Sequence, residues 1–268
     1  MTIAAFNRTI WTHYRHAGRT TLPWRHTRDP YAILVSEVML QQTQVGRVEG
    51  YYKDFLKRFP DFRSLARAKT PEVLKAWQGL GYNRRAMFLK RAAEIVVAQY
   101  GGRLPRDRAI LESLPGIGKG TSGSLMAFVF NEPAVFIETN IRRVFIHFFF
   151  PKRRKVTDAE LERYIKRSID KKNAREWYWA LMDYGAVMKI ANPNRRSAHY
   201  TKQSSFAGSD RELRGRILRS ILSTKKHRMS IRKLLTLFGA DRVRSKKIIG
   251  ALKDEEFVVR KGTYICIK

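Results

Sequence analysis

The sequence contains one cysteine, Cys266, in 268 residues. A single thiol cannot close an internal disulfide or build a cluster of thiolate ligands, so both kinds of site are excluded. Long apolar runs are also missing, because Arg142, Arg143 and His147 interrupt the apolar stretch between residues 137 and 150. The first ten residues lack the apolar core of a signal peptide. These absences predict a soluble, intracellular protein without a membrane partner.

Acidic residues are scarce, with 23 Asp and Glu against 54 Lys and Arg, and the formal net charge is +31. Self-repulsion among so many cations destabilises a compact fold, so the charge indicates a polyanionic partner. Nucleic acid is the first candidate. A ribosome-associated or generally adhesive basic protein is the alternative that composition alone leaves open.

The period-two alternation that marks strands is almost absent before the last dozen residues. Apolar residues recur instead at spacings of three and four, which predicts helices over 32–42, 47–59, 71–77, 84–100 and 159–169. Two of these have start signals, because Thr70-Pro71 places proline in a first helical turn and Thr157-Asp158 caps another. The body of the chain is therefore predicted to be all-α.

Residues 192–209 are polar, contain proline and glycine and lack helical periodicity, which predicts a linker or irregular loop. Beyond it the pattern predicts three short helices (210–222, 230–238 and 241–253) and then two strands (257–259 and 263–267), the order of a winged-helix module. The third helix carries four cations that suit a DNA groove or backbone: Arg242, Arg244, Lys246 and Lys247. A small packing domain with a solvated basic face is the alternative.

A glycine-rich turn, Leu114–Thr121 (LPGIGKGT), lies between two helical segments. Gly116, Gly118 and Gly120 permit backbone conformations that a side chain forbids, and they leave amide groups bare at the start of a helix, where the dipole favours anions. Such a hairpin grips a DNA phosphate without reading sequence, and Lys119 adds charge. Most glycine-rich turns are simple caps, so the argument depends on the charge and on the residues below.

Two acidic residues have apolar neighbours on both sides: Glu37, inside an apolar helix, and Glu138, just after an apolar stretch. Desolvation favours the protonated form of a carboxyl, which suits a general acid. Hydrolysis of an N-glycosidic bond needs an acid for the departing base and an anion for the oxocarbenium-like sugar, as the carboxylate pair of glycosidases shows. The alternative is that each carboxylate is paired in a salt bridge on a helix.

Several segments resemble the adenine DNA glycosylases, members of the helix-hairpin-helix superfamily that act on adenine opposite 8-oxoguanine. The segments that carry the resemblance are Leu22–Arg25 (LPWR), Ser36–Val45 (SEVMLQQTQV), Trp77–Tyr82 (WQGLGY), the Leu114–Thr121 hairpin and Leu181–Ala186 (LMDYGA). The resemblance runs from about residue 5 to residue 190. It implies a helix-hairpin-helix glycosylase fold of two helical subdomains with a cleft between them.

The resemblance also implies catalytic roles. Glu37 corresponds to the acid that protonates the adenine and later helps to activate water. Glu138 stands where the family has an aspartate that stabilises the cationic sugar, and Asn140 lies beside it. Gly120 occupies the position of the nucleophilic lysine in bifunctional relatives. Since no Schiff base forms without an amine, a monofunctional hydrolase without lyase activity is expected.

Other residues are implied in DNA contact. Gln42 and Tyr82 correspond to residues that enter the duplex and fill the space left by the flipped nucleotide, and Trp24 and Arg25 to residues near the extruded base. The residues expected to bind DNA are Leu114, Gly116, Gly118, Lys119, Gly120, Arg142 and Arg143 in the body and Arg242, Arg244, Lys246 and Lys247 in the module.

The predicted organisation follows from this resemblance. Residues 1–205 form the glycosylase domain, with a six-helix subdomain over about 27–133 and a second subdomain from 1–26 and 134–205. Residues 206–268 form the basic winged-helix-like module. The expected partner is double-stranded DNA with a mismatch or an oxidised base, bound by a monomer in the cytoplasm near the nucleoid.

Three departures from the family bear on activity. Glu138 is one methylene longer than aspartate, which moves the carboxylate by about 1.5 Å, and misplacement of that order costs about a hundredfold in rate. Residues 189–205 lack the four cysteines of the family's iron–sulfur loop, so no cluster and no metal are expected. A monovalent cation at the hairpin is the one ion left open. The family's C-terminal domain, which recognises 8-oxoguanine, is replaced by the winged-helix-like module.

Three functions compete. Removal of adenine opposite 8-oxoguanine or guanine leads, because the SEVMLQQTQV segment favours it. A mismatch glycosylase for thymine or uracil opposite guanine would use the same scaffold with a different pocket. A non-catalytic DNA-binding protein would bind lesions while Glu138 fails at chemistry, although the retained Glu37 and Asn140 count against it.

Overall fold

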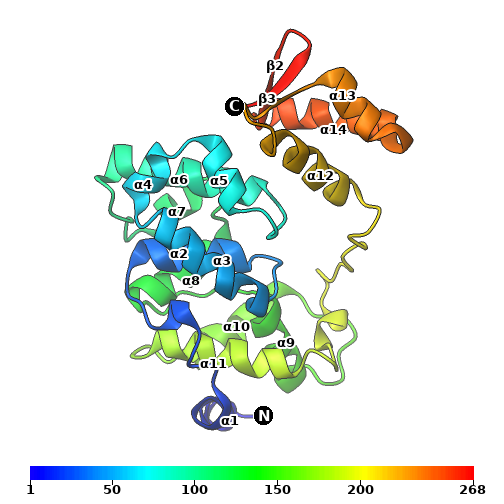
Figure 1. Ribbon diagram of the computed structural model, residues 1–268. Helices are drawn as coiled ribbons and strands as arrows, with labels where there is room; N and C mark the ends of the chain where they lie inside the picture. Colours follow the sequence, from blue (N-terminus) through cyan, green and yellow to red (C-terminus); the bar gives the residue numbers. More distant parts are fainter. The chain divides into compact units, whose positions relative to one another are not determined.

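The computed structural model describes residues 1–268, with the side chain of Ala240 excepted, and it is mostly helical (Figure 1). The first part of the chain forms α1 (Ile3–Ala17), η1 (Pro23–Arg25), α2 (Pro30–Leu40), α3 (Val45–Arg58), α4 (Phe62–Arg67), α5 (Thr70–Ala76), α6 (Arg84–Tyr100), α7 (Arg108–Ser113), α8 (Lys119–Phe130), α9 (Thr139–Phe149), α10 (Asp158–Ser168), α11 (Ala174–Val187) and η2 (Pro193–Arg196). The all-α prediction for the body is confirmed. Among the described residues, no helix is long and apolar enough to cross a membrane.

The helix ends follow the local sequence. Thr157 caps α10 through a capping box, in which its Oγ1 accepts from the Glu160 amide at 3.4 Å and the Glu160 carboxylate accepts from the Thr157 amide at 2.9 Å. Proline lies in the first turn of α5, as predicted. Helix α6 spans the predicted residues 84–100 and ends at Gly101, whose φ of 62° is left-handed.

The chain divides by packing into two compact units, and unit 1 comprises residues 1–38 and 103–202. Within it, α11 packs against α1, α8 and α9. An aromatic cluster fills this core, where the ring of Phe6 lies 5.0 Å from that of Phe145 and 6.0 Å from that of Trp177. Such ring pairs combine a large buried apolar area with favourable edge-to-face geometry. The cluster therefore fixes α9 against α11, and Glu138 stands at the N-terminus of α9.

Unit 2 comprises residues 39–102 and 203–268. In its first part, α4 and α5 pack against α6. In its second part, the chain forms α12 (Asp210–Leu222), β1 (Arg228–Ser230), α13 (Ile231–Leu237), η3 (Gly239–Asp241), α14 (Arg242–Asp254), β2 (Val258–Lys261) and β3 (Tyr264–Ile267). The three helices and the hairpin of the predicted winged-helix-like module are confirmed.

The module has one strand that the sequence did not predict. β1 pairs antiparallel with β3, with Arg228 opposite Cys266 and Ser230 opposite Tyr264, and the strand order in the sheet is β1-β3-β2. The expectation of two strands was therefore incomplete. Three residues are too few to show alternation, and their partner lies more than thirty residues further along the chain.

The packing units differ from the predicted domains. Packing groups residues 39–102 with 203–268, whereas the sequence placed a boundary between residues 205 and 206. That boundary, and the predicted subdomains of residues 1–205, stay predictions. The segment 192–209 is mostly irregular, as expected, but it contains η2 and a parallel bridge from Ser197 to Val156.

Candidate active site

Glu37 lies in α2, a helix that is apolar over most of its surface. Its flanking residues Ser36 and Val38 are buried, while Glu37 itself keeps a partly exposed surface. The Oγ of Ser124, on α8, donates a hydrogen bond of 2.6 Å to the Glu37 carboxylate. Burial raises the pKa of Glu37 from 4.5 to about 7, and the charge of Glu138 adds to the increase, while the Ser124 hydrogen bond opposes it. Glu37 can therefore hold a proton near neutral pH.

Glu138 is the N-cap residue of α9. Its Oε1 accepts hydrogen bonds from the backbone amides of Asn140 at 2.7 Å and Ile141 at 2.9 Å. Burial raises the pKa of Glu138 above its ordinary value, while these two amides and the guanidinium groups of Arg143 and Arg142 oppose the increase. Two amide donors, two cations and the positive end of the helix dipole all favour the anionic form of this carboxyl.

The start of α9 is held by close packing on α11. A Cβ built on Gly185 would lie 2.5 Å from the backbone oxygen of Asn140 and 2.6 Å from its Cβ, so only glycine fits there. Arg143 is buried, and its Nη1 donates to Asn140 Oδ1 at 3.0 Å and to the carbonyl of Gly185. Asn194, from η2, donates to the carbonyl of Thr139 at 2.9 Å. The Glu138–Asn140 segment is therefore fixed from three sides.

Glu37, Glu138 and Asn140 all lie in unit 1, and the charge of Glu138 acts on Glu37, while the catalytic roles of the three residues stay predictions. Sequence reasoning missed Ser124, because 87 residues separate it from Glu37 and nothing in its local sequence marks it. Two carboxyls in unequal environments, one with a single hydroxyl donor and one with amide and guanidinium donors, are suited to acid and anion roles respectively.

The predicted hairpin joins α7 to α8. Gly116 has a φ of 79°, and Gly118 is the N-cap residue of α8, with the exposed Lys119 in its first turn. Leu114 and Ile117 are buried and anchor the turn in the core. The exposed residues of the hairpin are thus Gly116, Gly118 and Lys119, at a helix N-terminus, while the buried side chain of Leu114 is not available for the predicted contact.

Trp24 and Arg25 lie in η1, and both are buried. Arg25 forms a bidentate ion pair with Asp183 on α11, with both distances 2.8 Å, and its guanidinium lies over the Trp179 ring at 5.3 Å. Burial alone would raise the pKa of Asp183, but Arg25 and Arg19 outweigh it and hold the value below the ordinary one. Arg25 is therefore engaged by Asp183 and Trp179 within the protein, and its place near the extruded base stays a prediction.

Two of the predicted DNA contacts in α9 are engaged within the protein. Arg142 pairs with Asp158 through bonds of 2.8 to 3.1 Å, and Arg143 is buried as described. In the module, Arg244 pairs with Asp210 and Asp241, each at 2.8 Å. Arg242, Lys246 and Lys247 are exposed on α14. The exposed cations are therefore the ones that a DNA phosphate can reach without breaking an ion pair.

Gln42 and Tyr82 lie in unit 2, on loops that follow α2 and α5, and both are exposed. Both have left-handed backbones, with φ of 55° and 46°. Gln203, from the segment before α12, donates to Gln42 Oε1 at 3.4 Å and to the Tyr82 hydroxyl. The structure therefore brings the two predicted duplex-entering residues together, and it adds a contact that the sequence did not predict.

A resident metal has no obvious ligands here. Among the described residues, no group of three or more His, Cys, Asp or Glu side chains could hold a metal ion. Cys266 lies in β3 of the module, so the segment after α11 has no thiolate to offer an iron–sulfur cluster. Hydrogen bonds hold this segment instead. Asn194 donates to the carbonyl of Thr139 at the start of α9, and Arg196 donates to the carbonyl of Pro151, just after the end of α9.

Comparisons with known proteins agree on the family. The model of the HhH-GPD superfamily of base excision DNA repair proteins matches residues 35–171, about half of the chain. The chain is 36% identical over 198 residues to the adenine DNA glycosylase of Buchnera aphidicola subsp. Baizongia pistaciae, covering 72% of this chain and 56% of that protein. It is 37% identical to the thymine/uracil-DNA glycosylase of Methanothermobacter thermautotrophicus, covering 54% of this chain and 65% of that protein.

A solved structure of a thermostable thymine-DNA glycosylase superposes with a TM-score of 0.62 at 31% identity, covering 69% of this chain and 86% of that one. The chain spans a little over half to about two thirds of the length of the two curated relatives named above. The similarity that the motifs indicated is confirmed at the level of family and fold. The chain belongs to the HhH-GPD superfamily of base excision DNA repair proteins.

Proposed function

We propose that this chain is a monofunctional DNA glycosylase that hydrolyses the N-glycosidic bond of adenine mispaired with 8-oxoguanine or guanine in duplex DNA. The observation that carries the proposal is the pair of unequal carboxyls, with Glu37 held near a pKa of about 7 and Glu138 at a helix N-terminus. The chemistry of base release calls for one of each kind.

In the proposed reaction, the target nucleotide leaves the stack, because its glycosidic bond is out of reach in a paired duplex. The protonated Glu37 carboxyl donates its proton to the departing base while the C–N bond breaks. The resulting Glu37 carboxylate then accepts a proton from the water that attacks the sugar, which restores the starting form. The Ser124 hydroxyl orients the Glu37 carboxyl through its 2.6 Å hydrogen bond.

Glu138 stabilises the cationic sugar as an anion. Its extra methylene, relative to aspartate, is accommodated by the helix cap, because Oε1 turns back to accept the amides of Asn140 and Ile141. Oε2 then has only a long contact of 3.5 Å, with the Asn140 side chain. One carboxylate oxygen is thus committed to structure and the other is left for the sugar.

Strand cleavage is not expected. Gly120 takes the position where bifunctional relatives carry a nucleophilic lysine, and a Schiff base needs that amine. A Cβ at Gly120 would meet one atom at 3.8 Å, the carbonyl oxygen of Ile137, which is ordinary contact. The position therefore has room for a side chain, and the lack of lyase chemistry follows from the missing amine alone.

The glycines of the α7–α8 hairpin and the exposed cations of α14 are the proposed contacts with DNA phosphates, in a monomer that acts near the nucleoid. No iron–sulfur cluster takes part, because the donors of residues 189–205 do not fit one. Hydrogen bonds from Asn194 and Arg196 stabilise this segment against the backbone around α9 instead.

Removal of thymine or uracil opposite guanine is the second candidate. The Methanothermobacter relative and the solved structure that carry those names are 37% and 31% identical to this chain over 54% and 69% of it, against 36% over 72% for the adenine-named relative. The SEVMLQQTQV segment favours adenine, but it forms only part of a pocket.

A single-turnover excision assay tests the proposal, with alkaline cleavage of abasic product on duplexes that carry adenine opposite 8-oxoguanine, adenine opposite guanine, thymine opposite guanine or uracil opposite guanine. Release of adenine is expected. Release of thymine or uracil alone would contradict adenine removal and support the second candidate function. Tight binding without release from any duplex would contradict a glycosylase.

A further inference from the structure

Four exposed or partly exposed polar side chains meet in unit 2: Gln42, Tyr82, Gln203 and Arg211, here called the polar cluster. Gln42 and Tyr82 have positive φ although neither is glycine. Such a backbone costs of order 1–3 kcal/mol per residue and persists mainly where the surroundings impose it, often at functional sites. The strain therefore points to a role for the cluster.

The surroundings that impose this strain centre on Arg85. Its buried guanidinium donates to the carbonyls of Met39 at 2.9 Å and Gln41 at 2.5 Å, on the loop of Gln42. It also donates to the carbonyls of Leu80 and Gly81, both at 3.2 Å, just before Tyr82. One rigid, planar donor thus holds both loops and projects their tips outward.

The other half of the cluster comes from the C-terminal part of unit 2. Arg211, in the first turn of α12, donates to the Tyr82 hydroxyl, and its guanidinium lies over the Tyr82 ring at 5.4 Å from the centroid. A second nitrogen of Arg211 donates to the Ser204 carbonyl at 2.7 Å. Gln203 bridges the Gln42 amide and the Tyr82 hydroxyl.

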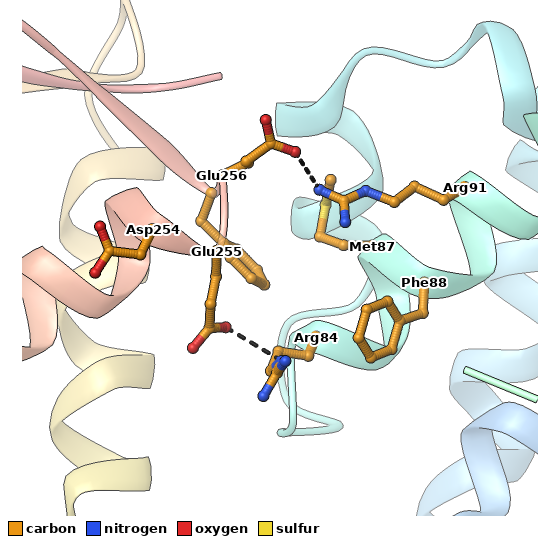
Figure 2. Close-up of a pocket in the computed structure, with 8 residues that line it drawn as sticks. Arg84, Met87, Phe88, Arg91, Asp254, Glu255 and Glu256 are labelled. Carbon is orange, nitrogen blue, oxygen red and sulfur yellow. Dashed lines mark hydrogen bonds and ion pairs between the residues drawn. The ribbon is translucent and has the colours of Figure 1, made fainter. Parts of the chain in front are cut away.

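Ion pairs hold the winged-helix module beside the polar cluster. Its acidic run Asp254–Glu256 contributes to a cavity against the basic face of α6. Figure 2 shows Glu255 facing Arg84, at 3.3 Å, and Glu256 facing Arg91, at 2.6 Å. Glu255 also pairs with Arg214 on α12 at 2.7 Å, so one carboxylate links α12 to α6. Arg211 is therefore placed at Tyr82 by the packing of the module.

We propose that Arg211 and Gln203 read the base opposite the excised one, and that the edge they recognise is the O6 carbonyl edge of a guanine-type purine. The inference rests on the proposed function, in which Gln42 and Tyr82 enter the duplex. The cluster is dominated by donors, since a guanidinium has only N–H groups and each amide adds two.

The chemistry of that edge fits the cluster. A guanine presents O6 and N7 as acceptors in the major groove, and the arginine fork matches this pair, whereas N7 of 8-oxoguanine carries a hydrogen, so O6 is the acceptor that both purines share. The guanidinium groups of Arg211 and Arg85 both lie over the Tyr82 ring, at 5.4 and 5.5 Å from its centroid, and Tyr82 is exposed. A base that contacts the exposed part of Tyr82 therefore comes within reach of the Arg211 donors.

The test compares full-length protein on two duplexes that differ at the opposite base, guanine or 2-aminopurine, which keeps N7 and lacks O6. The target base is adenine or, if the first assay so finds, thymine. The ratio of single-turnover rates and the ratio of Kd values are both measured. A bidentate base contact gives 1–3 kcal/mol of discrimination, so wild type should favour guanine by about tenfold.

Arg211→Ala should reduce this ratio to about one, and Arg211→Lys should also reduce it, because lysine keeps the charge without the fork. Gln203→Ala should reduce it by about fivefold, as one neutral hydrogen bond is worth about 1 kcal/mol. The control is Arg219→Ala, which removes the same charge from an exposed position on the same helix and should leave the ratio unchanged.

An Arg211→Ala variant that slows both duplexes equally overturns the inference in favour of a structural role. An Arg211→Ala variant that releases the base faster from both duplexes by the same factor also overturns it, because Arg211 would then only hold Tyr82 in a closed position. A wild-type enzyme that does not discriminate between the duplexes also overturns it. If wild type binds but releases no base from any duplex, the proposed function fails, and the Kd ratio still decides the role of Arg211.

Discussion

The two carboxyls of unit 1 and the polar cluster of unit 2 differ in their burial and in the groups that hold them in place. Glu37 lies on α2 and Glu138 caps α9; burial raises the pKa of both, and they are oriented by Ser124 and by backbone amides respectively. Gln42 and Tyr82 are exposed on strained loops that one buried arginine supports. A proton donor needs a dry, fixed site to hold its pKa, whereas residues that enter a duplex must project from the surface.

The difference also separates what each region contributes. Changes in the carboxyl site should alter the rate of base release with little effect on DNA affinity. Changes in the exposed surfaces should alter affinity and discrimination with little effect on the chemical step. The predictions below test this separation, beginning with the largest expected effect.

Glu37→Gln should reduce the rate of single-turnover base release by about 10²- to 10⁴-fold, the range expected for the loss of a general acid. The amide cannot donate an acidic proton, yet it keeps the shape and a hydrogen bond to Ser124. Duplex affinity, measured by fluorescence anisotropy, should stay within about twofold. Excision near the parent rate would remove Glu37 from the acid role.

Gly185→Ala should slow base release by about a hundredfold, the cost of misplacing a catalytic group by about 1 Å. The new Cβ would lie 2.5 Å from the Asn140 carbonyl and push the start of α9, with Glu138, away from its place. Stability should fall by about 1–3 kcal/mol through overpacking. The control is Gly50→Ala on α3, which meets no atom within 4 Å and should be neutral or stabilising. Equal activity in the two variants would contradict the placement of α9.

Neutralising Arg242, Lys246 and Lys247 together should weaken nonspecific DNA binding and reduce the salt slope, d log K/d log[salt], by about two to three units, at roughly 0.9 per phosphate contact. Base release at saturating protein should be unchanged. The matched control neutralises Lys166, Arg167 and Lys171, which are exposed in unit 1. If both triple variants keep the parent slope, α14 does not contact DNA.

The smallest effect concerns stability. Folding raises the pKa of Glu37 from 4.5 to about 7. The contribution of the protonated side chain to the free energy of unfolding is therefore fully present below pH 4.5 and is lost as the pH rises through 7. Because the side chain is partly exposed, Glu37→Gln should stabilise the protein at pH 8 by about 1–3 kcal/mol and by almost nothing at pH 4. Thermal unfolding at the two pH values measures this, and equal shifts at both would contradict burial as the cause.

Local features of the fold were predictable from the sequence. The 3.6-residue periodicity placed α6 at its observed bounds, and Thr157 caps α10 as expected. Helix α1 was not assigned, because its polar residues outweigh its apolar stripe, of which Phe6 and Ile10 are buried. Strand β1 was missed because its only partner, β3, lies near the end of the chain.

In the candidate site too, some residues were predictable from the sequence and others were not. Glu37 and Glu138 stood out because acids are rare in this chain and their neighbours are apolar. Ser124, Arg85 and Arg211 could not be found by that reasoning, since each acts on residues far away in the sequence. Arg143 was expected to contact DNA, but the structure shows it buried against Gly185, so its contact with DNA stays a prediction.

The central claim is that Glu37 delivers the proton, and the pH dependence of single-turnover excision tests it most directly. The rate on adenine opposite 8-oxoguanine should fall about tenfold per unit above about pH 7, because Glu37 must be protonated, and it should fall again at acid pH, where Glu138, whose pKa is also raised, takes up a proton. Ser124→Ala removes a hydrogen bond that lowers the pKa of Glu37, so the break should move to higher pH. A break at the same pH in both proteins, or a rate that rises through pH 7, would contradict the assignment.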